Sequence, residues 1–262
     1  MVTEVKLTSL LLLFIFVSSC TQNEKTVIAL SKGVGSENYL LYKKWLNSYN
    51  EKLEIINLYG LSYDEALEKL KECSGIILTG GPDVHPAFYG RGFDTSRCSI
   101  DSYRDTLEFR LINEINELKL PLLAICRGAQ IMNVAYGGSL IVDIPDDFGN
   151  NISHQSSEGD VFHNISIEDG SMLNILSESA FGTVNSNHHQ AVDSLADMFS
   201  ISALSSDGII EAFEYKDKSK PFMLAVQWHP ERMEADSRLS QPLALKFIEE
   251  AEKYRLKVLA NR

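Results

Sequence analysis

The segment "PLLAICRGAQIMNVAYGG" (residues 121–138) decides the fold of this chain. An apolar run leads into Cys126, Arg127 and Gly128 follow, and the next residues have helical spacing. This order predicts a buried strand, a sharp turn and a helix that begins at the turn. A purely structural cysteine belongs inside a strand or a helix, whereas Cys126 lies at the junction of the two.

The segments before this junction alternate between strand-like and helix-like patterns. We expect strands at residues 26–30, 53–59, 74–81 and 121–126, and helices at residues 36–50, 62–72 and 102–120. Ser36 and Ser62 are candidate helix N-caps, and Glu65 has the spacing of a capping box with Ser62. The alternation predicts a parallel sheet that helices cover on both faces.

The pattern changes after residue 139. Shorter apolar or alternating segments lie at residues 139–144, 161–168, 199–205, 208–216 and 222–228, and a closing helix is expected at residues 240–254. They predict extra antiparallel or mixed strands in the C-terminal half. Because no linker separates the halves, we predict one α/β domain over residues 27–262, a three-layer, mostly parallel sheet. Ligands are expected beyond the carboxyl ends of its parallel strands.

The first twenty residues have the pattern of a secretion signal. "KLTSLLLLFIFVSSC" (residues 6–20) is a short apolar run that ends in small residues, too short for a comfortable span of roughly 20 residues. Its end resembles the bacterial lipobox. This predicts a lipoprotein-type signal at residues 1–20, lipidation at Cys20 and a tether at residues 21–26. The protein would then be exported and anchored on a bacterial membrane, facing the periplasm or the cell surface. A plain cleaved signal and an uncleaved anchor are the alternatives.

Composition excludes several classes of function. A formal net charge of −12 over 262 residues, without a Lys/Arg-rich patch, argues against nucleic-acid binding. There is no phosphate-binding Gly-Lys-Ser/Thr motif and no Cys/His cluster with metal-ligand spacing. We therefore expect no cofactor, no metal and no nucleic-acid partner. Cys73 and Cys98 are a possible disulfide pair in an exported chain, but we expect them not to meet.

A nucleophilic site can form around Cys126. A helix N-terminus stabilises a thiolate, the form of cysteine that attacks carbonyl carbon. "AVQWHPE" (residues 225–231) ends in His229 and Glu231, which an extended backbone places on the same side. They would form the base and the orienting carboxylate that a thiol nucleophile needs. The alternatives are a buried, inert cysteine and a helix start with Glu231 exposed.

Backbone N–H groups near this cysteine can serve a developing oxyanion. The two glycines of "LTGGPDVHPAFYG" (residues 78–90) follow an expected strand, so that backbone can approach a ligand without side-chain obstruction. Gly81 is the expected donor from this loop, and Arg127 is the expected donor from the helix start. An ordinary tight turn is the other interpretation of the glycines.

These motifs together carry a resemblance to a known family. "ICRGAQ", "TGGPDVHPAFYG", "VNSNHHQAV", "YGGSLIVDI" and His-Pro-Glu are similar to the gamma-glutamyl-gamma-aminobutyrate hydrolase branch of the class I glutamine amidotransferase-like superfamily. The resemblance implies a flavodoxin-like fold and a triad of Cys126 as nucleophile, His229 as general acid and base, and Glu231 as orienter. It also implies backbone oxyanion donors at Gly81 and Arg127.

The same resemblance implies the substrate contacts. Gln130 would contact the glutamyl head, and four residues of the "SNHHQ" segment would line the pocket: Ser186, His188, His189 and Gln190. The adjacent histidines could instead be polar loop residues or a metal site, although no further ligand is spaced for a metal. Asp105 and Glu108, near the start of a long expected helix, could face the substrate ammonium or lie on a solvated helix face.

The function that follows is a cysteine hydrolase. It would cleave the γ-glutamyl amide bond of a small γ-glutamyl compound through a thioester and release glutamate and an amine. An ordinary histidine pKa would make activity fall in acid near pH 6 to 7. A glutaminase module of an amidotransferase and a non-catalytic γ-glutamyl-binding lipoprotein are the alternatives. A small-molecule substrate, a membrane through the lipid anchor and a second copy of the chain in a homodimer are the expected partners.

Overall fold

The computed structural model describes residues 25–149 and 152–261. The expected signal segment, the lipidation at Cys20 and most of the tether lie outside these residues, so export and anchoring stay predictions. In the part of the chain that is described, no helix is both long and apolar enough to cross a bilayer.

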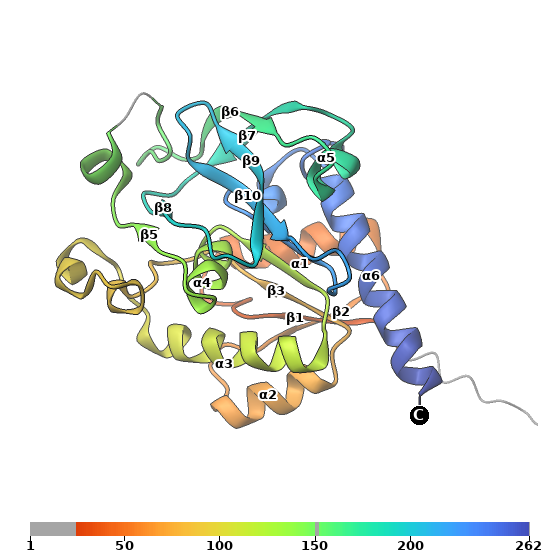
Figure 1. Ribbon diagram of the computed structural model, residues 1–262. Helices are drawn as coiled ribbons and strands as arrows, with labels where there is room; N and C mark the ends of the chain where they lie inside the picture. The colour runs from red at the N-terminus through yellow and green to blue at the C-terminus, as the bar shows by residue number, and fades with distance from the viewer. Residues whose placement is uncertain (1–24, 150–151, 262) are drawn as a thin grey trace, which may run out of the picture.

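Eleven strands of the described residues form one mixed sheet (Figure 1). Its main order is β2-β1-β3-β4-β11-β10-β9-β6-β7, and β5 and β8 pair beside β10. The first five strands in this order are parallel, and the others are antiparallel. The bounds are β1 Val27–Leu30, β2 Glu54–Asn57, β3 Gly75–Leu78, β4 Leu122–Ile125, β5 Leu140–Ile141, β6 Val161–Ile167, β7 Phe181–Ser186, β8 Ala191–Val192, β9 Phe199–Ser205, β10 Ile210–Tyr215 and β11 Met223–Val226.

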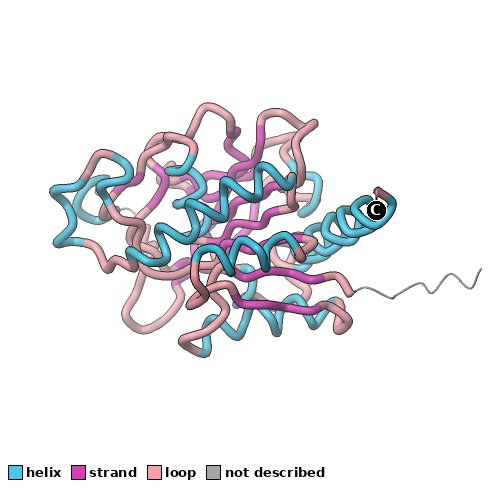
Figure 2. Tube along the Cα trace, turned by 90° about the horizontal axis from the view of Figure 1, so that it is seen from below, coloured by secondary structure: helices cyan, strands magenta, loops and turns pink. Residues whose placement is uncertain are grey.

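Helices cover both faces of the sheet, and Figure 2 shows them on either side of the strands when the molecule is seen from below. One hydrophobic core contains residues of α2, α3 and α4, and a second core contains residues of α1, α5 and α6. The bounds are α1 Glu37–Tyr49, α2 Tyr63–Lys71, α3 Ser102–Leu118, α4 Arg127–Ala135, α5 Met172–Ser177 and α6 Gln241–Ala260. The three-layer α/β fold with extra antiparallel strands is therefore confirmed.

Local predictions were correct where a local interaction decides the structure. Ser62 and Glu65 form the expected capping box at the start of α2. Ser36 is the N-cap residue of α1, as expected, but its side chain makes no cap hydrogen bond. The strand β7 (Phe181–Ser186) was missed because polar residues and a glycine interrupt its apolar pattern. It is nevertheless held by a long antiparallel pairing with β6.

The centre of the sheet brings the two halves of the chain together. β11 lies between β4 and β10, and Ile125 of β4 is in register with Val226 of β11. Cys126 directly follows β4, and His229 comes three residues after the end of β11. Since the two strands are parallel, both residues lie at their carboxyl ends, where ligands bind in open α/β sheets.

Candidate active site

Cys126 occupies a strained turn between β4 and α4. Its backbone has φ 52° and ψ −110°, a conformation that non-glycine residues rarely adopt. Its N–H donates a 2.8 Å hydrogen bond to the carbonyl of Val226, so the turn is tied to β11. A Cβ at Gly128 would lie 2.0 Å from the carbonyl oxygen of Leu78, so only glycine allows α4 to pack this closely on β3. Cys126 is only 5% exposed.

His229 and Glu231 form the pair expected from the His-Pro-Glu motif. His229 Nδ1 lies 2.7 Å from Glu231 Oε1, and Cys126 is close enough to the His229 ring to raise its pKa. Glu231 is 6% exposed, so the alternative of an exposed carboxylate at a helix start was wrong. Burial alone would lower the pKa of His229, but the Glu231 carboxylate and Cys126 raise it to about 10. The fall in activity near pH 6 to 7 that an ordinary histidine pKa predicts is therefore not expected.

The backbone of His229 is held by a residue that sequence reasoning missed. Asn185, on β7, accepts a 3.1 Å hydrogen bond from the His229 N–H and donates a 3.0 Å hydrogen bond to its carbonyl. The Asn185 amide also donates to Asp160, which pairs with Arg232 at 2.9 Å. The signal that could have found Asn185 is its place immediately before Ser186 in the "VNSNHHQAV" motif.

The Gly-Gly loop after β3 is held by two side chains. Tyr42 Oη accepts a 2.9 Å hydrogen bond from the Gly80 N–H. Arg104 donates to the carbonyls of Thr79 at 2.7 Å and Gly80 at 2.9 Å. A Cβ at Gly81 would lie 2.0 Å from Arg104 Nη1, so this glycine makes room for Arg104. In a trans peptide the C=O and the following N–H point in opposite directions, so Arg104 turns the Gly81 N–H away from itself.

A buried network of four charges lies under the nucleophile turn. Arg104 Nε donates to Glu108 at 2.9 Å, and Arg127 donates to Asp105 at 2.6 Å and also to Glu108. All four side chains are at most 1% exposed. Burial alone would raise the pKa of Glu108, but the two guanidinium groups hold it below its usual value. Asp105 and Glu108 therefore lie neither on a solvated helix face nor free to bind an ammonium group, and both expectations were wrong.

The expected substrate contacts are mostly buried and bonded to the protein. Gln130 Nε2 donates to the Gln190 carbonyl at 2.9 Å, and Ser186 Oγ donates to the His154 carbonyl at 2.7 Å. Gln190 is 1% exposed. His189 is half-buried, with its two ring nitrogens at 2.9 Å from Asp83 and 3.1 Å from Asp143.

The protonation states of the two adjacent histidines differ. Hydrogen bonding to Asp83, only partly offset by burial, raises the pKa of His189 to about 9. Burial, together with the neighbouring His154, lowers the pKa of His188 well below its usual value. His189 is thus a cation between two carboxylates, while His188 is a neutral ring in the interior.

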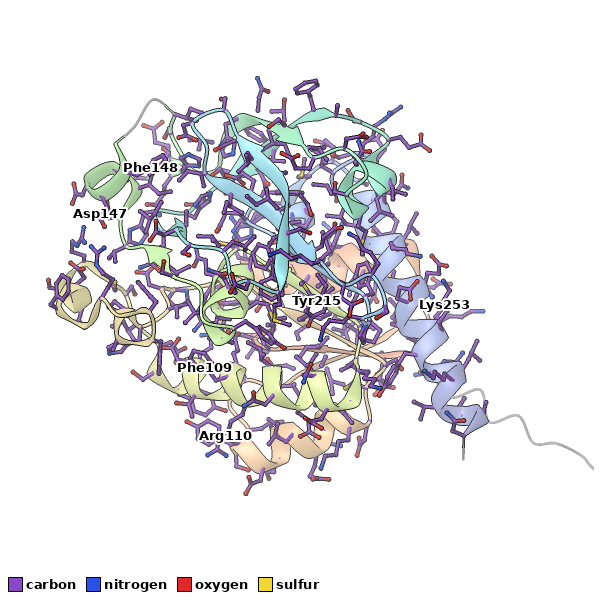
Figure 3. The ribbon with its side chains drawn as sticks, viewed as in Figure 1. Phe109, Arg110, Asp147, Phe148, Tyr215 and Lys253 are labelled. Atoms are coloured by element: carbon purple, nitrogen blue, oxygen red, sulfur yellow. The ribbon has the colours of Figure 1, made fainter. Side chains whose placement is uncertain are left out.

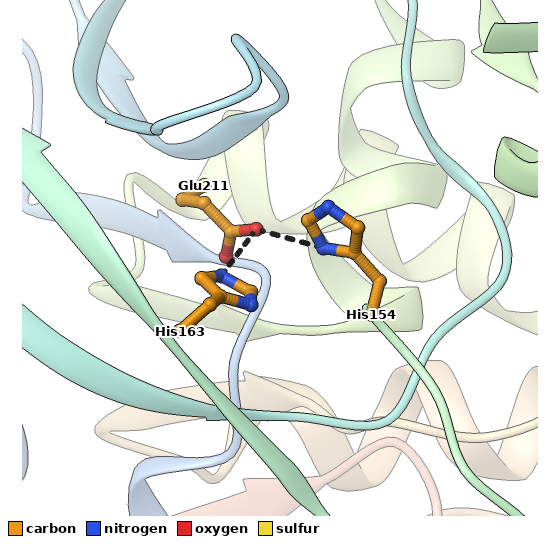
Figure 4. A group of neighbouring side chains, drawn as sticks. All are labelled: His154, His163 and Glu211. Atoms are coloured by element: carbon orange, nitrogen blue, oxygen red, sulfur yellow. Dashed lines mark ion pairs between the residues drawn. The ribbon is translucent and has the colours of Figure 1, made fainter. Parts of the chain in front are cut away.

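Possible metal ligands gather near these histidines, although no further ligand is spaced for a metal in the sequence. Ligand atoms of His154, His163 and Glu211 lie within 4.8 Å of one another, and all three side chains are buried (Figure 4). His188 Nε2 lies 3.8 Å from the same Glu211 carboxylate. The sequence spacing did not indicate this cluster, because its residues come from separate segments that only the antiparallel strands bring together.

Cys73, Cys98 and one of the surface hollows are distinct from this site. Cys73 and Cys98 are free thiols, which confirms that they do not pair. A hollow of about 710 Å³ is lined by Pro121 and Phe222, at the amino ends of β4 and β11 and therefore at the opposite end of these strands from Cys126. A smaller cavity of about 110 Å³ adjoins the Gly-Gly loop and is lined by Ser36, Asn38, Tyr39, Tyr42, Gly80, Gly81 and Arg232.

Comparison with known families defines the class of protein. The family model described as Peptidase C26 matches residues 56–231. A gamma-glutamyl-gamma-aminobutyrate hydrolase of Escherichia coli O157:H7 is 33% identical over 228 residues, which cover 82% of this chain and 87% of that protein. The chain therefore belongs to the Peptidase C26 family of class I glutamine amidotransferase-like hydrolases.

Other relatives agree in class but match over shorter lengths. Proteins of Mycobacterium tuberculosis, Lactococcus lactis and Schizosaccharomyces pombe that carry glutamine amidotransferase names are 37%, 39% and 37% identical. The chain spans 56%, 65% and 61% of their lengths, and the matches cover 66%, 60% and 60% of this chain.

Solved structures share the fold. The glutaminase domain of Trypanosoma brucei CTPS with bound acivicin superposes with a TM-score of 0.60 at 19% identity, covering 87% of this chain and 94% of that one. A glutamine amidotransferase of Thermotoga maritima gives a TM-score of 0.53 at 18% identity, covering 88% and 85%. At these identities the likeness supports the fold alone.

Proposed function

We propose that this protein is a thiol hydrolase that cleaves the γ-glutamyl amide bond of small γ-glutamyl compounds. The observation that carries the proposal is the chain of contacts from Cys126 to His229 to Glu231, with 2.7 Å between the last two side chains. A nucleophile, a base and an orienting carboxylate in this order are what thiol acyl transfer needs. The hydrolase relative from Escherichia coli motivates the choice of γ-glutamyl substrates.

In the first step the Cys126 thiolate attacks the side-chain amide carbonyl carbon and forms a C–S bond. The carbonyl oxygen becomes an oxyanion, for which the N–H groups of Gly81 and Arg127 are the proposed donors. The Cys126 carbonyl accepts the Gln130 N–H at 3.1 Å within α4, so the trans peptide turns the Arg127 N–H toward the start of the helix. The His229 imidazolium then gives its Nε2 proton to the leaving nitrogen, and the C–N bond breaks.

In the second step water hydrolyses the thioester. Neutral His229 accepts a proton from the water as it attacks the acyl carbon, and the C–S bond breaks. Glutamate leaves, and the protonated imidazole and the thiolate are restored. The raised pKa of His229 fits this cycle, because the imidazolium form starts the reaction as the general acid.

The test is a panel of γ-glutamyl amides incubated with the full chain, with released glutamate measured by mass spectrometry. Cys126→Ala should lower turnover by at least about 10⁴-fold, the scale of loss when a nucleophile is removed. Its melting temperature should stay close to that of the wild type. Substantial turnover by this variant would end the proposal.

A glutaminase module is the second candidate, favoured by the glutamine amidotransferase names of several relatives. The same panel separates the two functions. A hydrolase should act on amides with a large leaving amine without a second protein, whereas a glutaminase should act on free glutamine and be stimulated by a synthetase partner.

A further inference from the structure

The histidine cluster near the antiparallel strands contains lone pairs that face one another. His154 Nε2 lies 3.0 Å from Asp207 Oδ2, a carboxylate oxygen that can only accept, so Nε2 carries the hydrogen. The other nitrogen of a neutral His154 ring, Nδ1, is therefore bare, and it lies 3.6 Å from Glu211 Oε1. Since a carboxylate is also an acceptor, no hydrogen bond can join this pair.

His188 repeats the arrangement on another side of the same carboxylate. Its Nδ1 lies 2.9 Å from the carbonyl oxygen of Gln190, which fixes the hydrogen on Nδ1. Its bare Nε2 lies 3.8 Å from Glu211 Oε1. His163 adds a third ring, with Nε2 3.1 Å from Glu211 Oε1 but without a hydrogen bond between them. Within the described residues, neither oxygen of Glu211 has a hydrogen-bond partner.

These groups lie in the interior, where unpaired polar atoms are costly. Glu211 is 1% exposed, and the three histidines are 3–5% exposed. Leaving a buried acceptor unsatisfied costs about 1–3 kcal/mol, and more for a charged group. A bound cation would accept lone pairs from Glu211, His154 and His163 at once.

We propose that His154 Nδ1, His163 Nε2 and Glu211 Oε1 bind a divalent transition metal ion, with zinc as the best fit. Imidazole nitrogen and carboxylate oxygen are the ligands of zinc sites. Ligand atoms about 2.05 Å from a tetrahedral zinc ion lie about 3.3 Å from one another. Glu211 Oε1 lies 3.1 Å from His163 Nε2, 3.6 Å from His154 Nδ1 and 3.8 Å from His188 Nε2. These distances bracket the value expected around zinc.

Two of the three rings have the hydrogen-bond partner that metal-ligating histidines require, whereas His163 Nδ1 has none among the described residues. Metal-ligating histidines donate their second N–H to a carboxylate or a backbone carbonyl, as His154 does to Asp207 and His188 does to Gln190. Asp207 is itself held by the hydroxyl of Ser205. The ion would tie the segment that carries His154 to β6 and β10. The Gln190 carbonyl accepts hydrogen bonds from both His188 and Gln130. The metal site therefore adjoins the helix α4, which carries Gln130.

The test measures metal content and thermal melting of the full chain. It uses Cys126→Ala as the background, so that zinc cannot bind the catalytic thiol. After dialysis against zinc and removal of free ion, this protein should retain one zinc per chain, and zinc should raise its melting temperature because it binds only the folded state. Cobalt in its place should give the visible bands of a tetrahedral ion.

Three further substitutions in this background locate the ion. Glu211→Gln and His163→Asn should each weaken zinc binding at least about 100-fold and abolish the zinc-dependent rise in melting temperature. His189→Asn is the matched control, because His189 is the neighbour of His188 but pairs with Asp83 and Asp143. It should retain its zinc.

Several results would overturn the site. One is that the Cys126→Ala protein binds no zinc. Another is that Glu211→Gln and His163→Asn bind zinc as tightly as the Cys126→Ala protein does. Unfolding of Glu211→Gln in the presence of a chelator would also overturn it, because the proposal holds that this carboxylate is unpaired without the ion.

Discussion

Two buried polar clusters flank the nucleophile helix, and they differ in whether their charges balance. Under the turn, Arg104 and Arg127 face Asp105 and Glu108, so two cations meet two anions in direct contact. Beside the "SNHHQ" segment, the Glu211 carboxylate faces three imidazole rings and no guanidinium or ammonium group of the described residues. The charges of the first cluster are paired as the chain folds. The second needs something from outside the chain.

The largest expected effect compares the same substitution in both clusters. Glu108→Gln should lower the free energy of unfolding by about 3–5 kcal/mol, because it leaves buried guanidinium charge unpaired. Glu211→Gln, measured in chelator, should have no cost or be stabilising, because it removes a charge without a partner. Urea unfolding at pH 7 measures both changes. Equal losses of unfolding free energy in the two variants would show that Glu108 and Glu211 do not differ in charge pairing.

A smaller effect tests whether the cluster that contains Arg104 and Arg127 serves catalysis as well as stability. Arg104→Lys should lower kcat by about 100-fold with a smaller change in KM, because one ammonium group cannot hold the Thr79 and Gly80 carbonyls in Arg104's fork geometry. The Gly81 N–H would then lose its fixed direction. Arg110→Lys is the matched control, since Arg110 lies half-exposed on the outer side of the same helix (Figure 3). Parallel losses of kcat in both variants would remove this positioning role from Arg104.

The smallest expected effect concerns the histidine between the clusters. The raised pKa of His229 stabilises the fold below about pH 6.5, and this contribution is lost as pH rises through about 10. Activity should fall over the same alkaline range, because the imidazolium donates the proton to the leaving amine. Glu231→Gln should move this alkaline limb down by about one pH unit. Exposed Glu234→Gln should leave the limb in place, and an unchanged limb in Glu231→Gln would exclude Glu231 as the main cause of the raised pKa.

Sequence patterns predicted what neighbouring residues decide. The strand-turn-helix around Cys126 and the His229–Glu231 pair each depend on residues within a few positions, so their geometry could be expected from spacing. The alternation of strands and helices likewise predicted the parallel half of the sheet. The fold family then followed from five separated motifs.

The rest depended on strand order, which no local pattern contains. Asn185 reaches His229 only because β7 and the end of β11 converge, 44 positions apart in the chain. No local pattern indicates that the Arg104 and Arg127 side chains are buried, because the packing of α3 against α4 buries them. His154, His163 and Glu211 are spread over 58 residues, so their meeting could be seen only in three dimensions.

The position of β11 has a consequence for how the molecule comes into being. This is the last strand of the described chain, yet it lies in the middle of the sheet between β4 and β10. During synthesis the ribosome makes both flanking strands before the one that joins them, so the edge of β4 stays open until β11 has emerged. Contacts this distant in sequence also slow folding. A nascent chain that already carries Cys126 therefore lacks His229, and the proposed pair can form only after β11 has been made.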